Sequence, residues 1–151
     1  MNVTRSASSN PALTGRSVAL VAVGGMLGTG ARHGLTLITP TWADVPLATM
    51  AVNVAGAFAL GFLVGLWSHR PDDPRSNARG TRARLLWGTG LLGGFTTYSA
   101  LAIDVVSLVE AARAVAALGY AAGTVVLGLM AAWAGLVAGH SRNASVGEEA
   151  P

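Results

Sequence analysis

A short segment, Gly93–Ser99, interrupts a long apolar stretch of this sequence and constrains the fold more than any other feature. It reads Gly-Gly-Phe-Thr-Thr-Tyr-Ser, and its glycines and threonines weaken a helix and free backbone carbonyl groups. In a bilayer such groups must be satisfied by protein, water or an ion, so irregular backbone at that depth usually lines a site. The sequence therefore predicts a membrane helix that is broken at its middle, where something polar is bound or passed.

The composition favours a membrane protein. Of 151 residues, 52% are hydrophobic and 11% are charged, which is typical of a bundle of apolar helices. The absence of cysteine excludes a disulfide framework and a thiolate metal site. The basic residues are all arginine, and they flank apolar spans instead of forming a patch with interleaved aromatic residues. We therefore expect no nucleic-acid partner.

Four apolar stretches predict an all-α membrane protein with four transmembrane helices. They cover residues 17–38, 43–67, 85–109 and 114–139, each near the roughly 20 residues that cross a bilayer core. The Gly-Gly-Phe-Thr-Thr segment falls inside the third. We expect a channel domain over residues 16–140, with disordered tails at residues 1–15 and 141–151.

The distribution of arginines predicts the orientation in the membrane. With four spans, the loop over residues 69–84 lies on the same side as both termini. That side collects eight arginines, whereas the opposite side has Arg113 and, if its side chain reaches outward, Arg32. The positive-inside rule then places both termini in the cytoplasm, in a multi-pass protein of the cell membrane.

Glycines recur in pairs at four-residue spacing, which lets helix backbones approach closely where lipid gives no hydrophobic drive to associate. Four helices offer little interior, so this pattern also predicts oligomerisation. The pairs are Gly24/Gly28, Gly30/Gly34, Gly61/Gly65, Gly90/Gly94, Gly119/Gly123 and Gly135/Gly139.

The patterns typical of soluble enzymes are missing. Gly28-Thr29-Gly30 and Gly88-Thr89-Gly90 look like fragments of a nucleotide loop, but no strand precedes them and the chain has no lysine for a P-loop. There are no paired carboxylates, no nucleophile with a base and an orienting acid, and no histidines at metal-ligand spacing. We therefore expect that the protein is not an enzyme.

Few polar residues fall inside the predicted spans. Asn53 lies near the middle of the second, where a buried amide can line a polar path or clasp a neighbouring helix. Tyr120 and Thr124 share a face of the fourth span, and their hydroxyls can form a wet track or bond back to the preceding turn. Arg32 and Asp104 are intramembrane charges, and whether they pair with each other is left open.

Three blocks of the sequence resemble the Fluc family of fluoride channels, also called fluoride exporters. Gly24–Arg32 reads GGMLGTGAR, Asn53–Gly61 reads NVAGAFALG, and Gly90–Ser99 reads GLLGGFTTYS. The third block is the most distinctive, and the resemblance covers all four spans in order.

This resemblance implies a fluoride-selective channel made of two subunits in antiparallel orientation, through which cytoplasmic fluoride leaves the cell passively. It also implies a structural Na+ that is not transported, held on the dimer axis where the third helix is broken. By motif position, its carbonyl ligands fall on Gly93 and Thr96. Backbone carbonyls suit sodium because hard cations prefer oxygen ligands.

The resemblance implies pore-lining roles for four residues: Asn53, Tyr98, Tyr120 and Thr124. The polar residues expected to support them are Thr97, Arg32 and Asp104. The sequence departs from the family at four pore positions, with Tyr98 and Leu101 in place of two phenylalanines and Gly128 and Ala132 in place of hydroxyl residues. Tyrosine keeps a positive ring edge, whereas leucine has none.

The departures and the one-sided arginines lead to a hypothesis about the partner. A subunit with a strong orientation bias is expected to pair with a related, oppositely oriented subunit, and otherwise with a second copy of itself. Two other classes stay open. A small dimeric multidrug antiporter would need a carboxylate in its first helix. A non-conducting membrane assembly subunit would explain the glycine pairs but would not explain the helix break.

Overall fold

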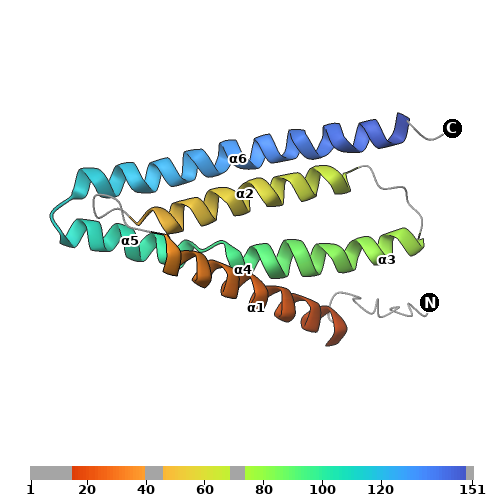
Figure 1. Ribbon diagram of the computed structural model, residues 1–151, viewed down its shortest axis with the longest axis horizontal. Coiled ribbons are helices and arrows are strands. Elements are labelled where there is room, and N and C mark those ends of the chain that lie inside the picture. The colour runs from red at the N-terminus through yellow and green to blue at the C-terminus, as the bar shows by residue number, and fades with distance from the viewer. Residues whose placement is uncertain (1–14, 40–45, 69–73, 149–151) are drawn as a thin grey trace, which may run out of the picture.

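The computed structural model describes residues 15–39, 46–68 and 74–148, and within these ranges the ordered elements are all helices. In chain order they are α1 (Gly15–Ile38), α2 (Leu47–Trp67), α3 (Pro74–Ala83), the π-helix η2 (Arg84–Leu92), α4 (Gly93–Phe95), α5 (Tyr98–Glu110) and α6 (Ala114–Glu148). The elements from α3 to α5 follow one another along a single rod, which lies beside α1 and below α2 and α6 in Figure 1.

Three segments are long and apolar enough to cross a membrane: Leu47–Trp67, Arg79–Glu110 and Ala114–Arg142. They match the second, third and fourth predicted spans. The 24 residues of α1 are not among them, because Arg16, Arg32, His33 and several glycines lower its hydropathy. The all-α membrane class is thus supported by these three helices, whereas a membrane crossing by α1 stays a prediction.

The predicted domain boundaries differ from the observed helix ends at the C-terminus. α6 continues through Ser141 to Glu148, so the helix includes most of the segment expected to be a disordered tail. Residues 149–151 and 1–14 of the two predicted tails lie outside the described residues, and helix α1 begins at Gly15.

The rods alternate in direction along the molecule. The start of α1, the end of α2, the start of α3 and the end of α6 lie at the same end (Figure 1). This end carries Arg16, Arg79, Arg82, Arg84 and Arg142, whereas Arg113 lies in the α5–α6 turn at the opposite end. The charge asymmetry inferred from the sequence therefore corresponds to the two ends of the bundle.

Two of the glycine pairs form a seam between α2 and α6. A methyl group at Gly61 would overlap the carbonyl of Ala132, and one at Gly65 would come within 2.9 Å of the Gly139 Cα. From the other side, Gly135 and Gly139 lie as closely against the backbone of α2 at Phe58 and Phe62. Backbone contact of this kind requires small residues on both helices, as the spacing predicts.

Two more pairs form a second seam, between α1 and the η2–α4 segment. Gly24 and Gly28 face the backbone of Leu86, Leu91 and Phe95, and Gly90 and Gly94 face α1 from the other side. The remaining pairs, Gly30/Gly34 and Gly119/Gly123, would meet nothing within 4 Å if they carried a methyl group. Four of the six glycine pairs therefore pack against helices of the same chain, and two pairs lie on open helix faces.

The turn between α5 and α6 is closed by a Schellman motif. The N–H of Arg113 donates to the Leu108 carbonyl at 2.9 Å, and the N–H of Ala112 donates to the Val109 carbonyl at 2.9 Å. Ala112 has a φ of 59°, the left-handed conformation that usually belongs to glycine at this position. This tight turn places α5 against α6, where Leu101, Leu108, Ala117 and Tyr120 form a buried cluster.

Candidate functional site

The backbone is extended for two residues between α4 and α5. Thr96 has φ −76° and ψ 152°, and Thr97 has φ −149° and ψ 122°. Both the N–H and the hydroxyl of Thr96 donate to the Leu92 carbonyl, at 2.9 and 2.8 Å, which ends the preceding helix. Thr97 starts the next one, because its hydroxyl accepts a hydrogen bond from the N–H of Ala100 at 3.2 Å, as an N-cap residue does.

Asn53 on α2 holds this extended step in place. Its Nδ2 donates to the Thr97 carbonyl at 2.9 Å, and its Oδ1 accepts from the Thr97 N–H at 2.8 Å. One turn further along α2, Gly56 leaves room for the methyl group of Thr96, which a Cβ at that position would overlap. Of the two roles that the sequence left open for Asn53, the helix clasp is present in the structure. The clasp uses one of the two Nδ2 hydrogens, so it leaves a donor for a second role.

The Asn53 clasp and the Thr97 N-cap change the hydrogen bonding of one backbone carbonyl each. In an uninterrupted α-helix, the Gly93 carbonyl accepts from the N–H of Thr97 and the Thr96 carbonyl accepts from the N–H of Ala100. Here these two N–H groups donate to Asn53 Oδ1 and to Thr97 Oγ1 instead. Both carbonyls have therefore lost their helical donors.

These two carbonyls suit a hard cation. Gly93 also faces open space, since a Cβ built there would meet nothing within 4 Å. The described residues contain no group of three histidine, aspartate, glutamate or cysteine side chains near enough to hold a metal. A cation at this point would therefore rest on backbone oxygens, and the Gly93 and Thr96 carbonyls have the chemistry that Na+ prefers.

Thr29 is a site residue that sequence reasoning missed. Its hydroxyl, on α1, donates to the Gly94 carbonyl at 3.3 Å, next to the break. In the sequence, Thr29 belongs to a fragment that looks like a nucleotide loop and to the first block that resembles the Fluc family, and neither gives it a role at this site. A hydroxyl between two glycines on a helix that packs closely against the broken segment was the available signal, but which carbonyl it meets depends on the fold.

The two positions after the threonine pair differ sharply in exposure. Tyr98 is 83% exposed, whereas Leu101 is only 8% exposed and belongs to the cluster between α5 and α6. Both line an apolar cleft of about 670 Å³ between these two helices. The exposed tyrosine is available to a second subunit or to a pore, and the leucine is mainly a packing residue of its own chain.

Tyr120 and Asp104 are brought together by the packing of α5 on α6. The Tyr120 hydroxyl lies 2.9 Å from Asp104 Oδ2 and 3.0 Å from the Pro46 carbonyl, and its side chain is 5% exposed. Because a phenol has one proton, these two acceptors share it. The Asp104 carboxylate thus has a donor within the chain, and the contact also fixes the entry to α2.

Thr124 is buried and its hydroxyl donates to the Tyr120 carbonyl at 2.7 Å, which is the bond back to the preceding turn that the sequence left open. The pore roles of Tyr120 and Thr124 stay predictions, since both hydroxyl protons are donated within this chain. In the part of the chain that the structure describes, no ion pair joins Arg32 to Asp104. The Nε atom of Arg32 is buried there without a hydrogen-bond partner.

The fold and this site together define a class of protein: an all-helical membrane protein in which polar side chains from α1 and α2 satisfy an extended step inside the third rod. Comparisons with known proteins give the family. A family model described as "CrcB-like protein, Camphor Resistance (CrcB)" matches residues 19–136.

Curated relatives agree with this match. The chain is 45% identical over 128 residues to a protein of Leifsonia xyli subsp. xyli named "Fluoride-specific ion channel FluC 2", a match that covers 84% of this chain and 86% of the relative. It is 43% identical over 123 residues to a protein named "Fluoride-specific ion channel FluC" from Paracoccus denitrificans, covering 79% and 90% of the two chains. A Pseudomonas fluorescens protein with the same name is 40% identical over 125 residues, covering 79% and 93%. The chain belongs to the CrcB family.

Proposed function

We propose that this protein is a subunit of a fluoride-selective ion channel in the cell membrane, and that it lets cytoplasmic fluoride leave the cell passively. The observation that carries the proposal is the 40–45% identity to relatives named as fluoride-specific channels over most of their length. Hydrogen fluoride crosses membranes uncharged and releases fluoride in the more alkaline cytoplasm. A channel lowers this concentration, and so the toxicity, without ATP and without enzymatic chemistry.

The donor for the anion in this proposal is the second hydrogen of Asn53 Nδ2. The first is fixed on the Thr97 carbonyl, so the amide is held in one orientation by the clasp. A preoriented donor can replace part of the hydration shell of fluoride without a large cost in ordering, which is the general logic of ion filters. Tyr98 can contribute the positive edge of its ring.

The channel is proposed to be a dimer of antiparallel subunits. Support comes from the faces that this chain leaves open: Tyr98 is 83% exposed, Gly93 faces open space, and Gly119 and Gly123 on α6 meet nothing of their own chain. Lipid alone does not require glycine on a helix face, whereas close approach of another helix does. A second subunit would cover the extended step and line the anion path.

A structural Na+ fits the proposed dimer, with the carbonyls of Gly93 and Thr96 as its ligands in each subunit. When bound, the ion would supply a fixed positive charge that lowers the electrostatic barrier for an anion. The purified protein should therefore unfold at a higher temperature in sodium than in potassium or N-methylglucamine chloride at equal ionic strength. An unfolding midpoint that does not depend on the cation would contradict the sodium site.

The arginines support a partner other than a second copy. Arg16, Arg79, Arg82, Arg84 and Arg142 lie at the end of the bundle that holds the ends of α2 and α6, whereas Arg113 lies at the other end. Such a bias favours one orientation, with both termini in the cytoplasm. We infer that this subunit pairs with a related subunit of opposite orientation.

Fluoride efflux from liposomes, followed with a fluoride electrode, tests the proposal. Vesicles that contain this chain together with a coexpressed homologous subunit should release fluoride, and chloride-loaded vesicles should not. Robust efflux from vesicles with this chain alone would refute the need for a partner. Absence of efflux in both preparations would favour a non-conducting assembly subunit, whereas a multidrug antiporter is disfavoured because α1 contains no carboxylate.

A further inference from the structure

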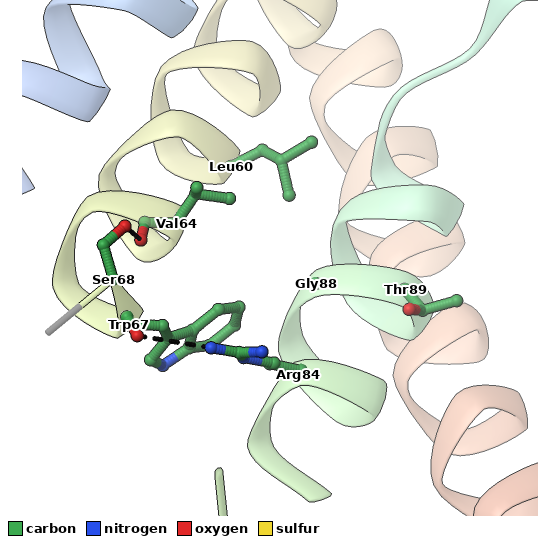
Figure 2. Close-up of a pocket in the computed structure, with 7 residues that line it drawn as sticks. All are labelled: Leu60, Val64, Trp67, Ser68, Arg84, Gly88 and Thr89. Carbon is green, nitrogen blue, oxygen red and sulfur yellow. Dashed lines mark hydrogen bonds between the residues drawn. The ribbon is translucent and has the colours of Figure 1, made fainter. Parts of the chain in front are cut away.

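A cleft of about 450 Å³ lies between the last turns of α2 and the start of η2, and the proposed channel function does not use it (Figure 2). Its lining consists of Leu60, Val64, Trp67, Ser68, Arg84, Gly88 and Thr89. We propose that this cleft binds an acidic phospholipid, with the phosphate at Arg84 and an acyl chain along Leu60 and Val64.

The arginine of the cleft is held in a defined position. Arg84 Nη2 donates to the Trp67 carbonyl at 3.2 Å, and the guanidinium carbon lies 5.6 Å from the centroid of the Trp67 ring. Figure 2 shows the guanidinium lying against this ring, between α2 and the rod that carries Arg84. A guanidinium has five N–H donors in a planar fork, so the bond to Trp67 leaves donors for two oxygens of a phosphate.

The cleft changes from polar to apolar along the helix axis, as a phospholipid does. Trp67 ends α2, and Arg84 lies beside it at the junction of α3 and η2. Tryptophan and arginine prefer the headgroup level of a membrane. Leu60 is seven residues before Trp67, or about 10 Å deeper at the rise of an α-helix. Leu60 and Val64 are 45% and 44% exposed and point toward the cleft (Figure 2), so they present a bare apolar wall below the arginine.

The charge of the surroundings selects an acidic headgroup. Among the described residues that line the cleft, Arg84 is the charged one, and none is acidic. Arg79 and Arg82, which are exposed on the adjoining helix, add positive charge at the same end of the bundle. Basic pockets between membrane helices are typical sites for acidic headgroups, and each nearby arginine strengthens attraction to an anionic surface.

Native mass spectrometry of the purified full-length protein tests the proposal, with phosphatidylglycerol compared with phosphatidylcholine. The unmodified protein should retain phosphatidylglycerol preferentially. Arg84→Gln should lower this retention at least about fivefold, because it removes both a charge near the surface and the donors for the phosphate. The matched control Arg82→Gln removes a charge outside the cleft and should lower retention clearly less. Arg84→Lys keeps the charge but loses the planar fork of donors, so its loss of lipid retention should lie between those of Arg82→Gln and Arg84→Gln.

Several results would overturn the proposal. Equal losses in Arg84→Gln and Arg82→Gln would mean diffuse attraction to the basic end, and displacement of the lipid by inorganic phosphate would mean a site for free anions. Leu60→Trp occupies the apolar part of the cleft without changing its charge and should also lower lipid retention. This variant tests the proposal if Arg84→Gln does not fold. Unchanged retention in Leu60→Trp would refute the acyl-chain site. Because the chain lacks cysteine, Val64→Cys is a unique thiol, and its cross-linking to another subunit would show that protein fills the cleft.

Discussion

The two glycine seams of this molecule use the same sequence pattern and support different kinds of backbone. Between α2 and α6, both helices are regular α-helices, and Gly61, Gly65, Gly135 and Gly139 bring them into backbone contact. Between α1 and its neighbour, the partner is a nine-residue π-helix that leads into three α-helical residues and then an extended step.

The difference lies in where the backbone hydrogen bonds go. In the regular seam, the helices satisfy their own N–H and C=O groups, so close contact adds only packing. In and beside the other seam, side chains complete the bonding: Thr29 on α1 binds the Gly94 carbonyl, and Asn53 on α2 binds both backbone groups of Thr97 in the extended step that follows. π-helical segments are rare and often mark functional sites. Glycine spacing therefore determines how closely two helices approach. Polar side chains determine where a membrane helix can leave its regular hydrogen-bond pattern.

The largest effect that separates the two seams is expected from Asn53→Asp. The aspartate places negative charge beside the proposed anion path and removes the donor to the Thr97 carbonyl. A like charge at about 4 Å costs about 4 kcal/mol at an effective dielectric constant of about 20, so fluoride efflux should fall at least about 100-fold. The measurement is electrode-monitored efflux from liposomes.

Asn53→Ala is the control for the charge, because it removes the clasp and the proposed anion donor without adding a negative charge. Its efflux should fall less than that of Asn53→Asp. Equal losses in the two variants would attribute the effect to the loss of the amide and not to the added charge, and unchanged efflux in Asn53→Asp would exclude Asn53 from the pore.

The next largest effect concerns the regular seam. In Gly61→Ala the new methyl group overlaps the Ala132 carbonyl, and two straight helices can relieve this only by moving apart. Overpacking of this kind costs about 1–3 kcal/mol, against a gain of up to about 1 kcal/mol in helix propensity. We expect a lower unfolding midpoint in detergent. Gly123→Ala on α6, where a methyl group meets nothing within 4 Å, should leave the midpoint unchanged or raise it.

Much of the fold was predictable because its signals are local. Hydropathy located the three helices that are apolar enough to cross a membrane, and the two adjacent threonines after Gly93 and Gly94 are the residues with extended backbone. Asn53 was singled out because an amide in an apolar span needs partners, although the sequence could not choose between a clasp and a pore. The roles in conduction and sodium binding were taken from resemblance and stay predictions.

Other features could not be predicted because they depend on contacts between distant segments. The π-helix over Arg84–Leu92 differs from an α-helix by its hydrogen-bond register, and nothing in the residues RLLWGTGLL requires that register. The bond from Tyr120 to the Pro46 carbonyl joins residues 74 positions apart. Leu101 was considered as a departure from a pore pattern, whereas its burial follows from how α5 packs on α6.

A smaller effect is expected from Gly28→Ala in the irregular seam. The added methyl group overlaps the Leu91 carbonyl and lies 2.8 Å from the Phe95 nitrogen. Because the partner segment changes there from the π-helix to the short α4 and becomes extended at Thr96, it can shift more readily than a straight helix. We expect a loss of about 1 kcal/mol, at the lower end of the usual range for overpacking.

Gly30→Ala is the matched control on the same helix, since its methyl group meets nothing within 4 Å. It should be neutral or slightly stabilising, because alanine favours helix over glycine. A midpoint for Gly28→Ala at or below that of Gly61→Ala would show that the irregular seam is as rigid as the regular one, and the comparison above would then be wrong.

The smallest effect is expected from Thr29→Val, which removes one hydroxyl and keeps the shape of the side chain. The bond to the Gly94 carbonyl is long, at 3.3 Å, and Thr29 is exposed in the isolated chain, so the loss should be about 0.5 kcal/mol. The Thr29→Val variant is informative because Gly94 adjoins Gly93, whose carbonyl is a proposed sodium ligand. If α1 helps to position that carbonyl, Thr29→Val should reduce the rise in unfolding midpoint that sodium gives over potassium. The control Thr36→Val, on the same helix, should not reduce it, because the Thr36 hydroxyl donates locally to the His33 carbonyl. Equal sodium responses in both variants would confine the role of α1 to packing.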